Sequence, residues 1–191
     1  MRLFVALELP GEVRAALADL ITQLKPMCRA ASWSRPEGMH VTLKFLGHAI
    51  ADSDTEKLAA ARAKLAEVQL EAPVEMGYRG VGFFPNARRP QVFWCGIQAS
   101  ANLAPLAADI ERALEPLGIP RESRTFVPHL TLARFKASEG VNALAGEAEK
   151  LAGREFGFAR ETEFHLFESK LKPGGAQHQK IASFAFARSD A

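Results

Sequence analysis

Two short segments of the sequence pair a histidine with a threonine at the same spacing. His40–Leu43 reads His-Val-Thr-Leu, and His129–Leu132, 89 positions later, reads His-Leu-Thr-Leu. Side chains of an extended strand alternate between its two faces, so the histidine and threonine of each segment are predicted to share one face. Each segment thus offers an imidazole together with a hydroxyl, and the duplication indicates one active site built from two similar strands.

Two imidazoles on opposite sides of one reacting atom are suited to general acid–base catalysis, because an imidazole gains and loses a proton near neutral pH. One imidazole can protonate a leaving oxygen while the other activates the nucleophile. A phosphodiester fits this arrangement, since in-line displacement separates the entering and leaving oxygens across phosphorus. The hydroxyls of Thr42 and Thr131 are then candidate donors to the non-bridging oxygens.

Lys44 and Arg134 are the candidate cations of this site. Lys44 lies four residues after His40 and is expected on the same strand face. Arg134 lies five residues after His129 and is expected on the opposite face, unless the strand twists, bulges or ends there. Both are predicted to bind substrate, and the spacing alone supports Lys44 better than Arg134.

Two other readings of the histidines are a zinc site and a binding module. A zinc site needs at least a third protein ligand, and no such spacing lies beside either motif, so neither a metal nor a cofactor is expected. A non-catalytic RNA- or nucleotide-binding module is the competing class, although the chain keeps both histidines, both threonines and Arg134. His48, His165 and His178 are expected to be structural, with the loop of His178 the best placed to reach a cleft. Further residues able to contact RNA, each with a structural alternative, are Trp33, Arg35, Phe45, Phe83, Phe84, Arg88, Arg89 and Arg124.

The composition is typical of a soluble globular protein. The chain has 191 residues, of which 48% are hydrophobic and 24% charged, enough for one substantial core. Because the net charge is only +2, any RNA contact must come from a local cluster of cations. Cys28 and Cys95 lack the spacing of a disulfide scaffold, and neither a signal peptide nor a membrane span is indicated. A cytoplasmic monomer without membrane contact is expected.

The order of predicted elements is repeated in the two halves of the chain. In the first half, strands are predicted at about 2–9, 39–46 and 74–81, and helices at about 13–24 and 52–68. In the second half, strands are predicted at about 91–98, 128–135, 156–169 and 179–187, and helices at about 102–117 and 138–151. The proline-rich, basic segment 83–90 is interpreted as the connection between two lobes.

The duplication predicts a two-lobed protein. The period is too long for a solenoid repeat, so we predict one domain over residues 1–191 with lobe-forming repeats at about 1–89 and 90–187. The expected fold class is α+β, in which two mostly antiparallel sheets face a central cleft and the helices lie outside. A pseudo-twofold axis would place the two histidine strands side by side across that cleft.

With these motifs, the chain resembles the 2H phosphoesterase superfamily, which is named for two histidine-x-threonine motifs. More closely, it resembles the RNA 2',3'-cyclic phosphodiesterases, also called 2'-5' RNA ligases. The matching segments are Arg2–Leu7, His40–Gly47, Phe126–Arg134 and Leu166–Leu171. Family members usually carry a tyrosine shortly after the C-terminal glycines, whereas this chain has His178, which puts the contacts of that ring in question.

The resemblance implies a bilobal fold and metal-independent hydrolysis of a terminal 2',3'-cyclic phosphate of RNA to a 2'-phosphate. By analogy, His40 would donate a proton to the departing 3'-oxygen, and His129 would accept one from water. Thr42, Thr131 and Arg134 would hold the phosphate. This direction comes from the resemblance alone, because the two motifs are alike. Run backwards, the geometry would join a 5'-hydroxyl to the cyclic phosphate, so ligation stays an alternative, and tRNA fragments are one candidate substrate among several.

Overall fold

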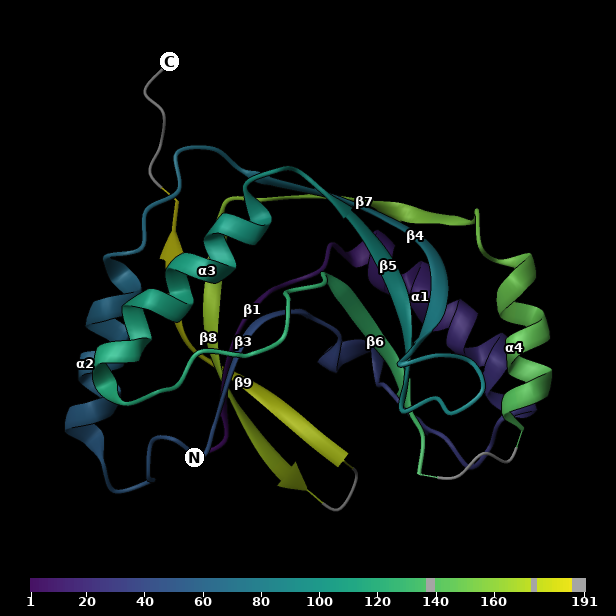
Figure 1. Ribbon diagram of the computed structural model, residues 1–191, viewed down its shortest axis with the longest axis horizontal. Coiled ribbons are helices and arrows are strands. Elements are labelled where there is room, and N and C mark those ends of the chain that lie inside the picture. Colours follow the sequence, from purple (N-terminus) through teal and green to yellow (C-terminus); the bar gives the residue numbers. More distant parts are fainter. Residues whose placement is uncertain (137–139, 173–174, 187–191) are drawn as a thin grey trace.

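Residues 1–136, 140–172 and 175–186 are described by the computed structural model, and in these residues the chain forms two antiparallel sheets (Figure 1). The first sheet has the order β3-β1-β8-β9 and consists of β1 (Leu3–Leu7), β3 (Val41–Gly47), β8 (Glu163–Lys172) and β9 (Gly175–Ala185). The second has the order β2-β6-β5-β4-β7 and consists of β2 (Ser32–Trp33), β4 (Val74–Phe84), β5 (Val92–Ala99), β6 (His129–Arg134) and β7 (Glu155–Glu161).

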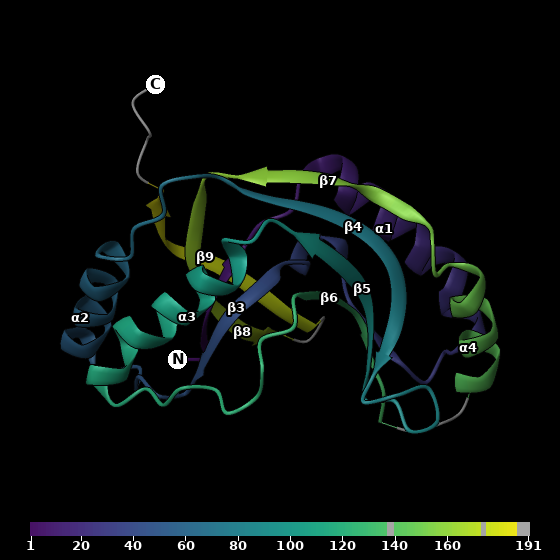
Figure 2. The same ribbon diagram turned by 45° about the horizontal axis from the view of Figure 1, so that its top comes forward.

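Helices cover the outer sides of these sheets. Within the described ranges, the α-helices are α1 (Gly11–Leu24), α2 (Thr55–Ala66), α3 (Leu103–Leu114) and α4 (Val141–Lys150), and the 3-10 turns are Lys25–Met27, Pro36–Gly38 and Glu115–Leu117. Helices α2 and α3 pack side by side over the first sheet, whereas α1 and α4 lie against the second (Figures 1 and 2). The predicted α+β fold class is therefore confirmed. No helix in the described ranges is long and apolar enough to cross a membrane.

Local sequence explains where the helices form. In α3, apolar residues three and four positions apart make one buried face, as expected of an amphipathic helix. These residues are Leu103, Leu106, Ile110 and Leu114. At the start of α2, the Asp54 carboxylate accepts a hydrogen bond of 2.9 Å from the backbone N–H of Lys57, which caps an otherwise unpaired donor.

The sheets do not correspond to the two halves of the chain. Strand β4, from the first half, pairs with β5 in the second sheet, and β8 and β9, from the second half, complete the first sheet. In the segment 83–90, Phe83 and Phe84 end β4 and pair with Phe93 and Val92, and the residues that follow form the turn of the β4–β5 hairpin. Its interpretation as a connection between lobes is therefore wrong. The spatial lobes therefore interleave the ranges of about 1–89 and 90–187. One cluster of buried side chains includes residues of α1, α2, α3 and α4 and of both sheets. The single domain over residues 1–191 stays a prediction.

The strand predicted at about 156–169 is two strands that belong to different sheets. Strand β7 pairs with β4, and after Thr162 the chain enters β8, which pairs with β1. The break is a single bend at Thr162, and no glycine, proline, asparagine or aspartate stands beside it to signal a turn in the sequence. Ser138 and Ala187, at ends of predicted elements, lie outside the described residues.

Candidate active site

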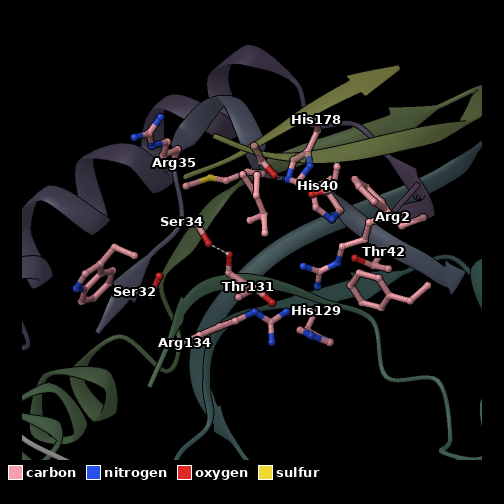
Figure 3. Close-up of a pocket in the computed structure, with 18 of the residues that line it drawn as sticks. Arg2, Ser32, Ser34, Arg35, His40, Thr42, His129, Thr131, Arg134 and His178 are labelled. Carbon is pink, nitrogen blue, oxygen red and sulfur yellow. Dashed lines mark hydrogen bonds between the residues drawn. The ribbon is translucent and has the colours of Figure 1, made fainter. Parts of the chain in front are cut away.

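A cavity of about 630 Å³ opens between the sheets, and both histidine motifs line it (Figure 3). His40 and Thr42 lie on one wall, and His129, Thr131 and Arg134 lie on the opposite wall. The polar and charged residues of the lining are Arg2, Ser32, Ser34, Arg35, His40, Thr42, His129, Thr131, Arg134, Lys136, Ser169 and His178. These described residues include four cations and no carboxylate, so the cavity suits an anion.

The two motif histidines make the same backbone hydrogen bond. His40 Nδ1 lies 2.7 Å from the carbonyl oxygen of Gly38, and His129 Nδ1 lies 2.8 Å from that of Val127, in each case two residues earlier. Since a carbonyl oxygen only accepts, each Nδ1 must carry the proton and donate it. In the neutral ring, Nε2 is then left with a lone pair, so each imidazole can take up or release a proton at Nε2 without leaving its carbonyl.

The two histidines differ in their surroundings. The His40 ring stacks on Phe4, with ring centroids 4.4 Å apart, and meets His178 edge-on at 5.2 Å. The His129 ring has an edge contact of 4.9 Å with Phe84. Burial lowers the pKa of His40 to about 4, and the charges of His178 and Arg134 contribute in the same direction, while the hydrogen bond to Gly38 opposes the shift. His40 is therefore neutral in the empty cavity at pH 7.

A β-bulge in each motif strand decides which later side chains reach the cavity. In β3, Thr42 pairs with Ala6 and Lys44 with Val5, so Leu43 is the extra residue. In β6, Thr131 pairs with Trp94 and Ala133 with Phe93, so Leu132, 89 positions after Leu43, is the extra residue. An extra residue reverses the alternation that follows it. The duplication therefore includes the bulge as well as the histidine and threonine.

Because of this bulge, the prediction that Lys44 shares the face of His40 is wrong. Lys44 is buried and lies outside the lining of the cavity, and its ammonium is 2.6 Å from the Glu111 carboxylate on α3 and 2.5 Å from the Pro120 carbonyl oxygen. Phe45, the next residue, lines the cavity in its place and is 52% exposed. Lys44 thus ties β3 to α3 and its following loop, away from the cavity that would hold the substrate.

The equivalent bulge in β6 brings Arg134 onto the face of His129 and Thr131. Arg134 lines the cavity, and its guanidinium points toward the same space as that of Arg2 (Figure 3). Partial burial and, secondarily, the charge of Arg2 lower the pKa of Arg134, although an arginine stays protonated at neutral pH. Two guanidinium groups that repel each other in a shared cavity favour the binding of an anion between them.

Two hydrogen bonds from Ser34 fix the backbone of the second motif. The Ser34 hydroxyl donates a hydrogen bond of 2.8 Å to the Thr131 carbonyl oxygen, and the Ser34 N–H donates one of 2.8 Å to the Leu132 carbonyl oxygen (Figure 3). These bonds extend the pairing of β2 with β6 and leave the Thr131 side chain directed to the cavity. Thr42 and Thr131 therefore lie where hydroxyl donors to a bound phosphate are needed.

The sequence was compared with profiles of known protein families. The profile of the 2'-5' RNA ligase superfamily matches residues 13–167. The chain belongs to this superfamily. The resemblance seen in the motifs is thereby confirmed.

Relatives within the superfamily match almost the whole chain. A protein of Archaeoglobus fulgidus named RNA 2',3'-cyclic phosphodiesterase is 32% identical over 184 residues, which cover 96% of this chain and 99% of that protein. One of Thermus thermophilus with the same name is 36% identical over 191 residues, covering 97% of this chain and 90% of that protein.

Solved structures of the superfamily share the fold. A crystal structure of a Thermus thermophilus protein is 32% identical with a TM-score of 0.77 and covers 99% of this chain and 100% of its own. The structure of E. coli LigT complexed with ATP is 25% identical with a TM-score of 0.76, and 98% of each chain is covered. The fold over nearly the whole chain is thus common to these structures and this member of the superfamily.

Only some of the other residues that the sequence suggested as RNA contacts line the cavity. Trp33, Arg35, Phe45 and His178 line the cavity, whereas Arg88, Arg89, Arg124, Phe83 and Phe84 do not, although Phe84 touches His129. Arg2 was not recognised as a site residue from its spacing. Arg2 directly precedes β1, which pairs with β3 in the register that sets Leu3 opposite Gly47, so strand pairing and no local pattern brings Arg2 to the cavity.

Among the described residues of this superfamily member, no group of three or more His, Cys, Asp or Glu side chains is placed to hold a metal ion. His40 and His129 are accompanied in the cavity by hydroxyls and cations rather than by carboxylates. Cations beside the imidazoles disfavour a bound metal ion by charge repulsion. The expectation of a site without metal or cofactor stays a prediction, which the assay below tests.

Proposed function

We propose that this protein hydrolyses the 2',3'-cyclic phosphate at the end of an RNA chain to a 2'-phosphate without a metal ion. Relatives that are 32% and 36% identical over nearly the whole chain are named RNA 2',3'-cyclic phosphodiesterase. The observation that carries the proposal is the pair of imidazoles on opposite walls of a cation-lined cavity, each with Nδ1 engaged by a carbonyl and Nε2 left for reaction.

In the proposed reaction, the two imidazoles move one proton each. His129 Nε2 accepts a proton from water as the water oxygen bonds to phosphorus, and the bond from phosphorus to the 3'-oxygen breaks. His40 Nε2 supplies the proton to that departing oxygen. The bond to the 2'-oxygen is kept, so the product ends in a 2'-phosphate and a 3'-hydroxyl. Thr42, Thr131 and Arg134 hydrogen bond to the non-bridging oxygens, whose charge rises in the transition state.

The donor role of His40 predicts proton uptake when the anion binds. Because the pKa of His40 is about 4 in the empty cavity, a phosphate anion beside the ring must raise that pKa by favouring the charged form. Binding of a 2'-nucleotide at about pH 5.5 is therefore expected to take up a proton from solution. Calorimetry in two buffers of different ionisation enthalpy measures this uptake. The uptake should disappear in His40→Ala, and uptake that persists in this variant would assign the proton to another group.

Arg134 is predicted to contribute to kcat/KM through both its charge and its paired hydrogen bonds to phosphate. Replacing Arg134 with Ala removes a guanidinium able to make two hydrogen bonds to phosphate, and is expected to lower kcat/KM about 10- to 100-fold. Arg134→Lys should recover only part of this loss, because an ammonium keeps the charge but not the paired geometry. Steady-state kinetics at two salt concentrations measure the effect. Equal kcat/KM for the wild-type protein and Arg134→Ala would remove Arg134 from the substrate contacts.

The direct test of the function is to incubate a short RNA that ends in a 2',3'-cyclic phosphate with the protein in excess EDTA. Hydrolysis is expected to add the mass of one water, and chromatography against 2'- and 3'-phosphate standards identifies the isomer. Activity that appears only when metal is restored would contradict the metal-independent mechanism. An unchanged end, with a control enzyme active on the same RNA, would contradict the proposed activity and leave binding alone.

Ligation is the second candidate, favoured by the superfamily to which the chain belongs. In this direction a 5'-hydroxyl takes the place of water, and expulsion of the 3'-oxygen leaves a 2'-5' linkage. Adding an RNA with a 5'-hydroxyl to the same assay tests it, with and without a nucleotide. Absence of a longer product across these conditions would exclude ligation by this protein.

We infer that the substrate class is RNA fragments, of which tRNA fragments are one example, and that the protein acts as a monomer. The four cations in the cavity lining support a chain with more than one phosphate over a single cyclic nucleotide. Comparing kcat/KM for a cyclic mononucleotide and for a short RNA with the same end distinguishes the two substrates.

A further inference from the structure

His178 packs directly against the reactive end of the first motif. It lies on β9 opposite Ser169 of β8, and its ring meets Phe4 edge-on at 5.0 Å and His40 edge-on at 5.2 Å. A side-chain carbon placed on Gly38 would lie 3.4 Å from Cδ2 and 3.5 Å from Nε2 of His178, so the ring also covers the backbone of Gly38. Gly38 is the residue whose carbonyl holds His40 Nδ1.

These contacts leave the His40 ring little freedom. Phe4 covers one face, the His178 ring meets it at a right angle, and the carbonyl of Gly38 fixes Nδ1. His178 contacts two parts of this arrangement, the ring itself and the backbone that carries the carbonyl. At the second motif the ring in contact with His129 is the uncharged Phe84. The first motif therefore has a neighbour that is able to titrate, and the second has an apolar one in the matching role.

The His178 imidazole lines both the main cavity and a smaller one. Both His40 and His178 line this second cavity, of about 150 Å³. His178 Nδ1 is buried and has no hydrogen-bond partner among the described residues, so its ring is held by packing rather than by a polar anchor. The charged and titratable groups that face the pair are Arg2 and Arg134 in the main cavity, with His129 opposite, and Glu8, Arg14, Glu37 and Lys180 in the smaller one.

We propose that His178 is a positioning residue for His40, which holds the His40 imidazole in its reactive orientation and, through its own charge, opposes protonation of His40. Two adjacent imidazoles cannot both be protonated without repulsion. The same direction follows from the low pKa of His40, to which the charge of His178 contributes after burial. Burial and the charge of Arg2 lower the pKa of His178 itself.

Two substitutions separate the packing of His178 from its charge. His178→Ala removes both, and is expected to lower kcat about tenfold with little change in KM, because His40 is then free to leave the reacting atom. His178→Phe keeps a ring of similar size and should recover most of the lost kcat at its own optimal pH. His48→Ala is the matched control, since His48 is exposed and lines neither cavity, and its kinetics should equal those of the wild-type protein.

The charge is measured without turnover. We expect the pKa of His40, followed by NMR of the imidazole and assigned with His40→Ala, to rise by about 0.5 or more in His178→Phe, because two unit charges about 5 Å apart repel by at least that much even in water and by more in a partly buried site. In a pH profile of kcat/KM, the limb that belongs to His40 should move toward higher pH by the same amount. Rise of the pKa in His178→Phe together with loss of kcat only in His178→Ala supports the proposal.

An unchanged pKa of His40 in His178→Phe, or wild-type kcat in His178→Ala, would overturn it. The kinetic readouts rest on the proposed function, whereas the NMR titration does not. If the wild-type protein fails to open a cyclic phosphate, the proposed function fails, and the titration still tests whether His178 controls His40. If His178→Ala does not fold, His178→Phe and the His40 titration still decide the charge effect.

Discussion

Alanine in place of either His40 or His129 is expected to lower kcat about 10²- to 10⁴-fold, the usual contribution of a positioned general acid or base. Each motif imidazole has its Nδ1 engaged by a backbone carbonyl, and the described lining residues include no carboxylate able to replace it. KM should change far less, because Arg134 and the threonines keep their contacts with the phosphate. Single-turnover kinetics with a cyclic-phosphate RNA measure the chemical step.

The double variant and a distant histidine control this experiment. Acid and base act in one transition state, so the kcat of the double variant should be only a little lower than that of the less active single variant. His48→Ala should retain the wild-type kcat. Circular dichroism and thermal unfolding check that each variant is folded. Near wild-type kcat in both single variants would exclude the two-histidine mechanism, whereas a loss in only one would show that water or substrate replaces the other.

Replacing Lys44 with Met is expected to lower the free energy of unfolding by about 3 kcal/mol while leaving kcat and KM of the folded protein near wild type. The side chain of Lys44 is 4% exposed and that of its partner Glu111 is 16% exposed, so the substitution leaves a mostly buried carboxylate without its cation. It also removes the donor to the Pro120 carbonyl oxygen. Methionine keeps the packing of the aliphatic stem, so the change is chiefly electrostatic.

A double-mutant cycle with Glu111→Gln isolates this ion pair. In the Glu111→Gln background, Lys44→Met should lower the free energy of unfolding much less, because no carboxylate is left unpaired. Equilibrium unfolding in urea gives the four free energies. A KM for RNA that rises severalfold in fully folded Lys44→Met would instead return Lys44 to the substrate site, against its buried position.

Much of the site could be predicted from local sequence. The shared face of His40 with Thr42, and of His129 with Thr131, follows from strand alternation, which operates between neighbouring residues. Helix α3 follows from the spacing of its apolar residues, which is also a local property. The reactive groups and their duplication were therefore determined by the sequence itself.

The face of a side chain beyond the threonine depended on strand pairing. Lys44 and Arg134 were placed by counting alternate residues, and the count failed in both strands at the bulges of Leu43 and Leu132. A bulge exists only relative to the neighbouring strand, because it is a mismatch in the number of residues between paired positions. The periodicity of one strand therefore cannot predict a bulge. Because of the bulge at Leu43, the side chain that lines the cavity is Phe45 and not Lys44.

The sequence alone thus determined the chemistry of each motif strand, the antiparallel α+β class and the positions of most helices, since these rest on periodicities of a few residues. Tertiary structure alone decided that β4 and β8 join sheets with strands of the other half of the chain, that Arg2 enters the cavity, and that His178 lies against His40. These features depend on hydrogen bonding and packing between segments far apart in the chain, for which local sequence holds no signal.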